Sequence, residues 1–480
     1  MKQVPTGVKG LDRVLYGGFL RPSTVLIAGT AGTGKTTFVM QSIFNAAKND
    51  EVCMYVTALS EPIAMINNFM SKFSFYNISL LAKGNVKYVP IDIETLHKGG
   101  KAVIEELERH IEIIKPDRIV IDPVNVFTFG HDEESERQFY YDFFTTMKGW
   151  NSLVMLTGEF TFDALVKSTV GYLVDGIIQI NNEPYYEKNI RFLNILKMRG
   201  QEFYSGRQPC KITKDGFVVF PNLPVDAMPS VSNERIPTGI KGLDSMTGNG
   251  FIRGSSNLLS GSSGTGKTVF GIQFIMDGLL KNEPALIVSF EEDAAQIREN
   301  SKSFGWKLQE FEDKGMLKII SLSEFDVHEL AVMIEEFTEK LNVKRILFDG
   351  TGRLQRLLPK YTQLPEYIGG ITNYLKSRNI TAIYTNETSN LTGIIEVTGT
   401  GVSPLMDTVI LLRYVEINSE MRKAISVLKM RGSDHDKEIR ELVINEKGVQ
   451  IKQPFREYSG ILSGNPVKKP AEAFVEAFKK

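Results

Sequence analysis

The chain has 480 residues, more than the roughly 250–300 that one hydrophobic core supports, so at least two domains are expected. Hydrophobic residues make up 42% and charged residues 24% of it, as in ordinary soluble globular proteins, which excludes a disordered or fibrous architecture. The 56 Lys and Arg balance the 57 Asp and Glu to a net charge of -1, so no overall field gathers nucleic acid or an acidic membrane.

Cysteine content and apolar runs indicate the compartment. Cys53 and Cys210 are too few for a disulfide framework and fit a reducing environment. The first ten residues lack the apolar segment of a signal peptide, and no apolar run approaches the roughly 20 residues that span a bilayer. The five histidines have no ligand-like spacing, so no structural metal site is expected. We therefore expect a cytoplasmic protein that crosses no membrane.

One long repeat organises the chain. PTGVKGLD at residues 5–12 returns as PTGIKGLD at 237–244, an offset of 237 − 5 = 232 residues. The same offset relates two glycine-rich loops, two KMRG segments and one aspartate, at Gly29 and Gly261, 197–200 and 429–432, and Asp175 and Asp407. A repeat of this length is a whole domain and not a solenoid unit. The predicted domains are residues 1–222 and 236–466, with a proline-containing linker at 223–235 and a short tail at 467–480.

Each half alternates strands of buried character with helical segments. Residues 23–28, 118–122 and 152–157 are continuous apolar runs, as in strands that are covered on both faces. This pattern predicts the α/β class, with a mainly parallel central sheet sandwiched by helices in each of two tandem domains. In such sheets, ligands bind at the carboxyl ends of the strands.

A phosphate-binding loop follows an early strand of each half. GTAGTGKT at residues 29–36 and GSSGTGKT at 261–268 both fit G-x-x-x-x-G-K-[ST], and an apolar helical segment follows each. Glycines let backbone N–H groups converge on phosphate oxygens, and the helix behind adds its positive dipole end. The alternative is an accidental glycine turn, which the strand-loop-helix context and the duplication disfavour. The expected ATP-binding residues are Gly32, Thr33, Gly34, Lys35 and Thr36, and Gly264, Thr265, Gly266, Lys267 and Thr268, with the lysines on the β- and γ-phosphates.

Magnesium needs oxygen ligands beside the phosphates. The hydroxyls of Thr36 and Thr268 supply one each. An aspartate that ends an apolar strand normally holds the ion through a water, and Asp122 and Asp349 end the runs RIVID and RILFD. The alternative, an ordinary aspartate in a strand-end turn, is common where no phosphate loop lies upstream. We expect ATP and Mg²⁺ at both loops.

The two halves differ where water must be activated. A strand of the second half ends in Glu291 and Glu292, and because successive strand residues face opposite ways, Glu291 can face the metal while Glu292 faces the water. The offset of 232 places Leu59 and Ser60 there in the first half, with Glu61 one residue later. The alternative for the pair is a solvated acidic helix start. We expect the pair to make the second domain the faster ATPase, while ATP in the first domain mainly holds structure.

The paired loops, residues 290–292 and KMRG at 429–432 together resemble the KaiC family, the double-domain RecA-like ATPases and autokinases of the cyanobacterial clock. The resemblance spans nearly the whole chain and is densest from residues 407–417 through 434–437. It implies tandem RecA-like domains, stacked as a double-ring homohexamer with ATP between protomers.

The resemblance also implies contacts made across protomers. At a neighbour's ATP it implies Lys197, Met198 and Arg199 in the first domain and Lys429, Met430, Arg431, Ser433 and His435 in the second. On the base side of the nucleotide it implies Ser71 and Phe304, the latter stacked on adenine. A charged group that one protomer supplies to its neighbour's ATP can accelerate hydrolysis by ~10³–10⁵-fold. The alternative interpretation of the two KMRG segments is that their basic side chains lie on a solvent-exposed face.

The resemblance is weaker at the phosphorylation site and at the tail. The Ser-Thr pair that takes phosphate in the family falls on Ser403 and Pro404, and proline has no hydroxyl, so an ordered two-site cycle cannot run on this pair. A serine autokinase using Ser403 stays open, with Thr398 and Thr400 nearby, and the alternative for Ser403 is a turn before a strand. The family's longer tail receives a regulatory partner, so the short tail here leaves any such partner unassigned.

Two other functions fit the same fold. A RecA-superfamily DNA recombinase or motor needs basic loops with exposed aromatic residues, whereas here Arg353, Arg356 and Lys360 form only a mild cluster. Nucleic acid is therefore not an expected partner, and stimulation of the ATPase by single-stranded DNA would reverse that view. A signalling scaffold that ATP assembles, with incidental turnover, uses the same lysines and aspartates.

Overall fold

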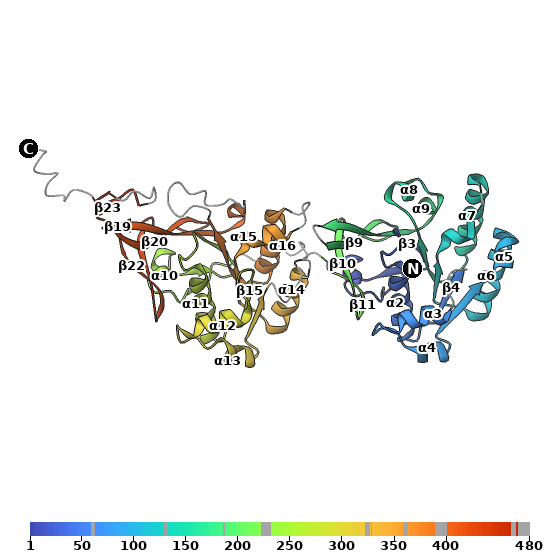
Figure 1. Cartoon of the computed structure of the whole chain (residues 1–480), viewed down its shortest axis with the longest axis horizontal. Helices are drawn as coiled ribbons and strands as arrows, with labels where there is room; N and C mark the ends of the chain where they lie inside the picture. Colours follow the sequence, from blue (N-terminus) through green and yellow to red (C-terminus); the bar gives the residue numbers. More distant parts are fainter. Residues whose placement is uncertain are drawn as a thin grey trace, which may run out of the picture. The chain divides into compact units, whose positions relative to one another are not determined.

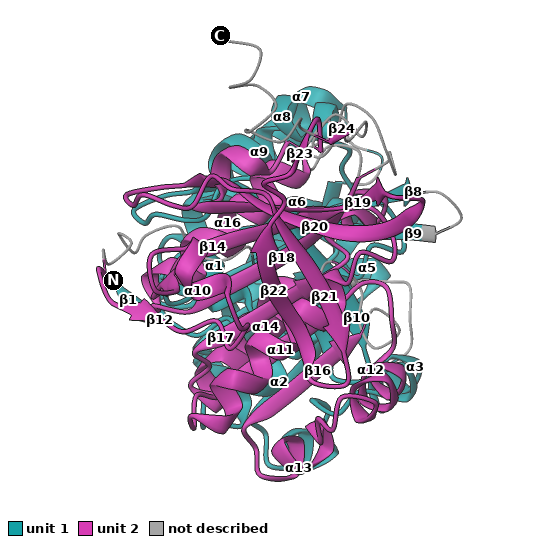
Figure 2. Ribbon diagram, turned by 90° about the vertical axis from the view of Figure 1, so that its left-hand side faces the viewer, with its two compact units in different colours: residues 1–221 teal, residues 222–480 magenta. Residues whose placement is uncertain are grey.

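The structure is a computed structural model that describes residues 1–58, 63–128, 130, 132–185, 188–221, 232–321, 327, 329–358, 363–388, 401–461 and 467–468. The chain divides into two compact units, residues 1–221 and 222–480, which Figure 2 colours separately. The predicted linker falls mostly outside the described residues, so its boundaries stay a prediction. Its last residue, Arg235, begins a strand.

A mixed sheet forms the centre of the first unit. Among the described residues it has nine strands, in the order β11-β10-β9-β8-β3-β7-β6-β4-β5. The parallel strands are β8 (Gly176–Tyr185), β3 (Ser23–Ala28), β7 (Leu153–Gly158), β6 (Arg118–Asp122), β4 (Cys53–Ala58) and β5 (Val86–Ile91). The antiparallel strands are β9 (Lys188–Met198), β10 (Arg207–Thr213) and β11 (Gly216–Val219). A small separate pair joins β1 (Lys2–Val4) to β2 (Phe19–Arg21).

Helices cover both faces of this sheet (Figure 1). In chain order they are α1 (Leu11–Val14), α2 (Lys35–Ala47), α3 (Ile63–Met70), α4 (Ile78–Ala82), α5 (Ile93–His97), α6 (Gly100–Ile114), the 3₁₀ turn η1 (Val124–Thr128), α7 (Glu133–Met147), α8 (Phe162–Lys167) and α9 (Thr169–Leu173). Two apolar clusters, one on each face, form the core. Phe38 of α2 belongs to one and Phe143 of α7 to the other, and both are fully buried.

The second unit repeats this plan. Its described strands follow the order β16-β15-β17-β18-β14-β19-β20-β21-β22. The parallel strands are β16 (Leu317–Ser321), β15 (Ala285–Ser289), β17 (Arg345–Asp349), β18 (Thr381–Glu387), β14 (Ser256–Gly261) and β19 (Thr408–Ile417), and the antiparallel ones are β20 (Glu420–Met430), β21 (Arg440–Asn445) and β22 (Gly448–Pro454). Two short pairs join β12 (Arg235–Ile236) to β13 (Phe251–Ile252) and β23 (Tyr458–Ser459) to β24 (Val467–Lys468).

The helices of the second unit again lie on both faces. They are α10 (Leu243–Met246), α11 (Lys267–Leu280), α12 (Ala294–Lys302), α13 (Leu308–Asp313), α14 (Leu330–Leu341), α15 (Thr351–Leu357), α16 (Leu364–Ser377) and the 3₁₀ turn η3 (Ser403–Leu405). The prediction of two α/β units with mainly parallel, helix-covered sheets is confirmed. Among the described residues, no helix is long and apolar enough to span a bilayer.

The repeated PTG-x-KGLD motif has a structural role. The backbone N–H of Thr6 donates to Asp12 Oδ1 over 2.7 Å, and that of Thr238 donates to Asp244 Oδ1 over 2.9 Å, so each motif folds into the same turn. Gly10 has a φ of 84° and its Cα lies so close to the chain that an added Cβ would sit 2.1 Å from Val219 O. Only glycine fits there, because a left-handed backbone and a backbone neighbour coincide.

Candidate nucleotide-binding sites

The first phosphate loop joins β3 to α2 at the carboxyl edge of the sheet, the edge at which the parallel strands end. Gly34 caps α2 with a φ of 99°, and a Cβ on it would lie 2.6 Å from Ile212 Cδ1. Because glycine has no side chain with which to cap the helix, the first N–H groups of α2 stay available to an anion. Gly32 also has a positive φ of 76°, and the Thr33 hydroxyl donates to Thr30 O over 2.8 Å, which ties the loop to itself.

Lys35 is held inside this loop. Its Nζ donates to Gly29 O and to Thr30 O, each over 2.9 Å, and lies 4.0 Å from Glu159 Oε1. Burial lowers the pKa of the Lys35 ammonium, while the negative charges of Glu159 and Asp122 oppose that shift. The ammonium thus lies at the loop with carboxylates around it, ready to be shared with phosphate oxygens.

The predicted partners converge on one cavity of about 470 Å³. Thr36 and Asp122 line it with Lys35, and the other lining residues are Ala31, Gly32, Gly34, Thr37, Tyr55, Thr57, Ile66, Pro123, Glu159 and Ile212. Asp122 Oδ2 accepts a 2.8 Å hydrogen bond from the Tyr55 hydroxyl, and Oδ1 accepts one from Thr157. The structure therefore brings together the lysine, the hydroxyl and the strand-end aspartate of the first unit.

The second loop repeats this geometry between β14 and α11. Lys267 Nζ donates to Gly261 O and Ser262 O, each over 2.9 Å, and Gly266 caps the helix with a φ of 101°. Burial lowers the pKa of Lys267, opposed by the charges of Glu387, Glu291 and Asp349. Thr265 donates to Ser262 O over 2.8 Å, and the Tyr414 hydroxyl donates to Gly264 O over 2.7 Å.

A buried carboxylate lies directly beside the second loop. Thr268 Oγ1 donates to Asp349 Oδ2 over 2.9 Å, and Thr385 Oγ1 donates to Asp349 Oδ1 over 2.7 Å. Burial raises the pKa of Asp349, and these two hydroxyls oppose the shift. A hydroxyl paired with a buried carboxylate at a phosphate loop is the oxygen set that suits Mg²⁺ bound to a nucleotide. No cluster of three or more His, Cys, Asp or Glu able to hold a metal occurs in the described part of the chain.

Glu291 and Glu292 lie after the end of the strand, and their side chains have different partners. β15 ends at Ser289, whose hydroxyl accepts the N–H groups of both glutamates over 3.4 and 3.0 Å. The expectation that strand alternation separates the pair is therefore wrong, because this side-chain turn ends the strand first. Glu291 lies against Gly350, and partial burial and the Asp349 charge raise its pKa. Glu292 instead accepts a 3.1 Å hydrogen bond from Asn300 of α12.

The family of the chain follows from comparison with known sequences. The family model "ATPase: KaiC" matches twice, at residues 4–224 and 236–455. The chain belongs to the KaiC family of ATPases. The "Circadian clock oscillator protein KaiC" of Parathermosynechococcus lividus is 33% identical over 96% of this chain and 88% of its own length. The protein of the same name from a Nostoc species is 31% identical over 98% and 92%, and the "Circadian clock protein KaiC3" of a Synechocystis species is 31% identical over 97% and 95%.

The basic residues of the two KMRG segments lie at the opposite edge, which we call the amino edge, where the parallel strands begin. β9 runs antiparallel to β8, so Lys197 pairs with Ile177, which pairs with Leu26, three residues before Gly29. Lys197 Nζ donates to Gly171 O and Tyr172 O of α9 over 3.2 and 2.9 Å. Arg199 forms a 3.4 Å ion pair with Asp175.

The second unit places its basic residues in the same way. Lys429 donates to Ser403 O and Met406 O over 3.2 and 2.8 Å, and Arg431 donates to Pro404 O over 2.5 Å. Burial, then the charge of Arg431, lowers the pKa of Lys429. Met198 and Met430 end β9 and β20, and Met430 is buried there. Within one unit these segments do not meet their own phosphate loop.

The other residues predicted to contact nucleotide have partners within their own units. Ser71 is exposed and donates to Asn68 O over 2.8 Å, and the Phe304 ring stacks on Trp306 with centroids 4.8 Å apart. Ser433 accepts a 2.5 Å hydrogen bond from Arg235, and the His435 N–H donates to Asp434 Oδ1 over 2.9 Å. These positions stay predictions as nucleotide contacts.

Ser403 is described, whereas Thr398 and Thr400 lie outside the described residues. It opens η3, half-buried, just before β19 at the amino edge. Its carbonyl accepts the Lys429 hydrogen bond, so the basic residue and the serine form one local group at the edge opposite the second loop.

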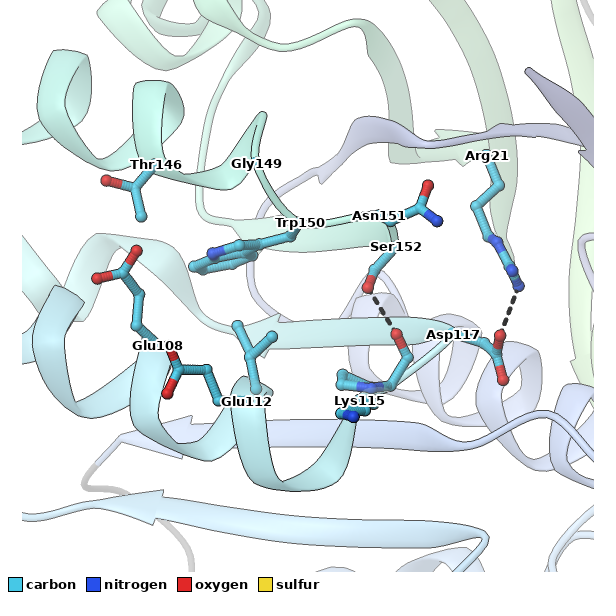
Figure 3. A pocket seen from close by; sticks show the side chains of 12 residues that line it. Arg21, Glu108, Glu112, Lys115, Asp117, Thr146, Gly149, Trp150, Asn151 and Ser152 are labelled. Carbon is cyan, nitrogen blue, oxygen red and sulfur yellow. Dashed lines mark hydrogen bonds and ion pairs between the residues drawn. The ribbon is translucent and has the colours of Figure 1, made fainter.

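A second cavity of about 480 Å³ lies at the amino edge of the first unit (Figure 3). Arg21 pairs there with Asp117 over 2.8 Å, and the Ser152 hydroxyl donates to Pro116 O over 2.6 Å. Glu108 and Glu112 face it from α6. No phosphate-loop residue lines this second cavity.

Several residues at the sites were not found from the sequence. Glu159 and Glu387 follow or end strands next to the phosphate-loop strands, and Tyr55, Thr157 and Thr385 hold the aspartates. The signal that could have found them was the repeat itself, because Thr157-Gly158-Glu159 and Thr385-Asn386-Glu387 recur with one offset of 228.

Proposed function

We propose that the protein binds Mg²⁺-ATP at both phosphate loops and hydrolyses it, with each nucleotide lying between protomers of a ring. The observation that carries this is the convergence of a loop lysine, a loop threonine and a strand-end aspartate in each unit: Lys35, Thr36 and Asp122 at one cavity, and the corresponding second set. Thr36 and Thr268 would hold the magnesium ion directly, and Asp122 and Asp349 would hold it through water. The ion would neutralise charge on the β- and γ-phosphates.

Calorimetry on nucleotide-stripped protein tests the binding. We expect two ATP per chain for the unaltered protein, one for Lys35→Ala or Lys267→Ala, and none for the double variant. Unchanged uptake by the double variant would sink the proposal.

The second unit is proposed to be the faster ATPase. Glu291 lies against Gly350 and next to Asp349. Burial lowers the pKa of Lys267, and the Glu291 charge opposes that shift. The counterparts in the first half are Leu59 and Ser60, which lie outside the described residues. A general base contributes typically 10²–10⁴-fold. Replacing Glu291 and Glu292 by Gln should therefore remove most turnover while both ATP molecules stay bound, and unchanged turnover would contradict the assignment.

The ring is proposed because each unit separates the two halves of a site. The second phosphate loop, with Lys267, would bind phosphate at the carboxyl edge of the sheet. Lys429 and Arg431 lie at the amino edge, where they could contact the ATP of another protomer. This arrangement agrees with a homohexamer of the KaiC type, with the KMRG basic residues acting on a neighbour's ATP.

Mixed assemblies test the shared site. The Lys267→Ala variant lacks the loop lysine, and the Arg431→Ala variant lacks the arginine that would act on a neighbour's ATP. An assembly that contains only one of these variants should therefore show no ATP turnover in its second units. A random equal mixture restores both partners at about a quarter of interfaces. Recovery of second-unit turnover after co-assembly is the expected result, and no recovery in assemblies of confirmed ring mass would refute the shared site.

Serine autokinase activity is the finer proposal for the second unit. Ser403 lies beside Lys429 at the amino edge, so a neighbour's ATP, and not that of its own unit, would supply the phosphate. Mass spectrometry after incubation with Mg²⁺-ATP should find phosphate on Ser403 and none in Ser403→Ala. Absence of phosphate on Ser403, Thr398 and Thr400 would remove the autokinase.

A further inference from the structure

The cavity of the first unit contains a carboxylate that the sequence did not single out. Among the described residues that line it, Asp122 and Glu159 are the two acids. Asp122 is only 9% exposed, and both of its oxygens accept hydrogen bonds from hydroxyls. The Glu159 side chain is 63% exposed, and its Oε1 lies 4.0 Å from Lys35 Nζ. One acid is therefore fixed for a structural or metal role, while the other faces the cavity with its oxygens open to water.

The backbone holds Glu159 in place from two sides. Gly158 ends β7, the strand next to β3, and its carbonyl accepts the Gly29 N–H over 3.3 Å. The Glu159 N–H donates to Asn125 Oδ1 over 2.9 Å. The carboxylate thus projects from a fixed point beside the first residue of the phosphate loop. Because Lys35 is the group that meets the β- and γ-phosphates, a carboxylate next to its ammonium lies at the phosphate end of the site.

The internal repeat places a glutamate at the same point of the second unit. Thr24 pairs with Val154 and Ser256 pairs with Ala382, so this part of the repeat has an offset of 382 − 154 = 228. The offset relates Glu159 to Glu387, because 387 − 159 is also 228. Glu387 is exposed, and burial lowers the pKa of Lys267 while the Glu387 charge opposes that shift. The second site therefore has this glutamate and Glu291 together.

We propose that Glu159 is the residue that orients and deprotonates the attacking water in the first unit. This rests on the proposed function, since it requires ATP at Lys35. The water oxygen bonds to the γ-phosphorus as the bond from that phosphorus to the β,γ-bridging oxygen breaks, and ADP leaves with the electron pair. The water's proton passes to the Glu159 carboxylate and then to solvent. Lys35 and the loop amides hold the phosphates during this step.

The full-length chain with Glu291→Gln, Glu292→Gln and Glu387→Gln provides the background for the test. Its second unit then lacks both glutamates after β15 and the counterpart of Glu159, so its residual turnover comes from the first unit. ATP binding is measured by calorimetry, and ADP formation is followed in a single turnover. We expect Glu159→Gln to keep two ATP per chain while the rate of ADP formation falls about 100-fold. Glu159→Asp should recover part of the rate, and Asp163→Asn, an exposed acid of α8 outside the cavity, should leave it unchanged.

The dissociation constant for ATP adds a second readout, which separates the chemical step from binding. Glu159→Gln should lower the single-turnover rate of ADP formation while the dissociation constant at the first unit stays the same. An unchanged rate in Glu159→Gln overturns the inference, as does a loss in Glu61→Gln with none in Glu159→Gln. If the background binds two ATP and forms no ADP, this inference fails while the binding proposal stands. If it binds no ATP at the first unit, the proposed function itself fails there.

Discussion

Replacing Thr385 by Val should destabilise the second unit by about 3 kcal/mol. The Thr385 side chain is 1% exposed, and its hydroxyl donates to Asp349 Oδ1 and accepts the Gly350 N–H, both over 2.7 Å. A hydrogen bond to a charged acceptor contributes about 1.5–3 kcal/mol, and an unsatisfied buried N–H costs about 1–3 kcal/mol. Valine is nearly the same size, so no cavity adds to this cost, and the extra methyl group offsets a small part of it.

Each unit has one tryptophan, so tryptophan fluorescence can follow the unfolding of each unit separately. Trp306 reports on the second unit once Trp150 is replaced by Phe. With a urea dependence of about 2–3 kcal/mol per M, the Thr385→Val midpoint should fall by about 1–1.5 M. Thr385→Ser keeps the hydroxyl and loses a methyl group, so we expect about 1 kcal/mol for it.

The first unit provides a matched control. Thr157 donates to Asp122 Oδ1 in the same way as Thr385 donates to Asp349. The residue after Asp122 is Pro123, however, which has no N–H that the loss of the hydroxyl could leave unsatisfied. Thr157→Val, followed through Trp150 in a Trp306→Phe background, should therefore cost less than Thr385→Val. The reasoning is refuted if Thr385→Val changes stability by less than 0.5 kcal/mol, roughly the scatter of surface substitutions, or if the two valine variants cost the same.

Three further outcomes are expected. Burial raises the pKa of Asp349 in the folded unit, so the folded state binds the Asp349 proton more tightly than the unfolded state does, and the stability that this proton contributes is lost as pH rises through the raised pKa. Asp349→Asn should therefore raise the urea midpoint of the nucleotide-free second unit at pH 8. Below about pH 3.9, where Asp349 is protonated in both states, the same substitution should not raise it. Arg345→Met should cost about 1–3 kcal/mol in urea unfolding, since Arg345 is 1% exposed and bridges Asp277 and Glu283, which keep only their second partners Lys281 and Arg253. Burial raises the pKa of Cys53 to about 12 and also raises that of Cys210, so a thiol reagent at pH 8 should label neither until the chain unfolds; rapid labelling of the native protein would contradict this.

Features encoded by adjacent residues were predictable from the sequence. The strands at 23–28 and 118–122 match β3 and β6, and Asp122 ends its strand as expected. Both loops could be found because left-handed glycines, an apolar strand and a following helix occur within a few residues of each other. Local physics fixes these elements before any long-range contact forms.

Features that depend on sheet order or on competing side chains could not be predicted. Glu159 gains its importance because β7 lies beside β3, although about 125 residues separate them in the chain, a neighbourhood that local patterns do not encode. The end of β15 at Ser289 depends on a serine hydroxyl that captures two N–H groups, which apolar periodicity does not register. The predicted trans roles of Lys197 and Lys429 concern a neighbouring protomer, and in one chain both donate to backbone carbonyls.

The lysines of the two phosphate loops also fix the shape of the loops themselves. Lys35 Nζ bridges two carbonyl oxygens of its own loop, and Lys267 Nζ does the same in the second unit. Because each turn is tied together by its own lysine, binding a phosphate group there would cost little ordering entropy.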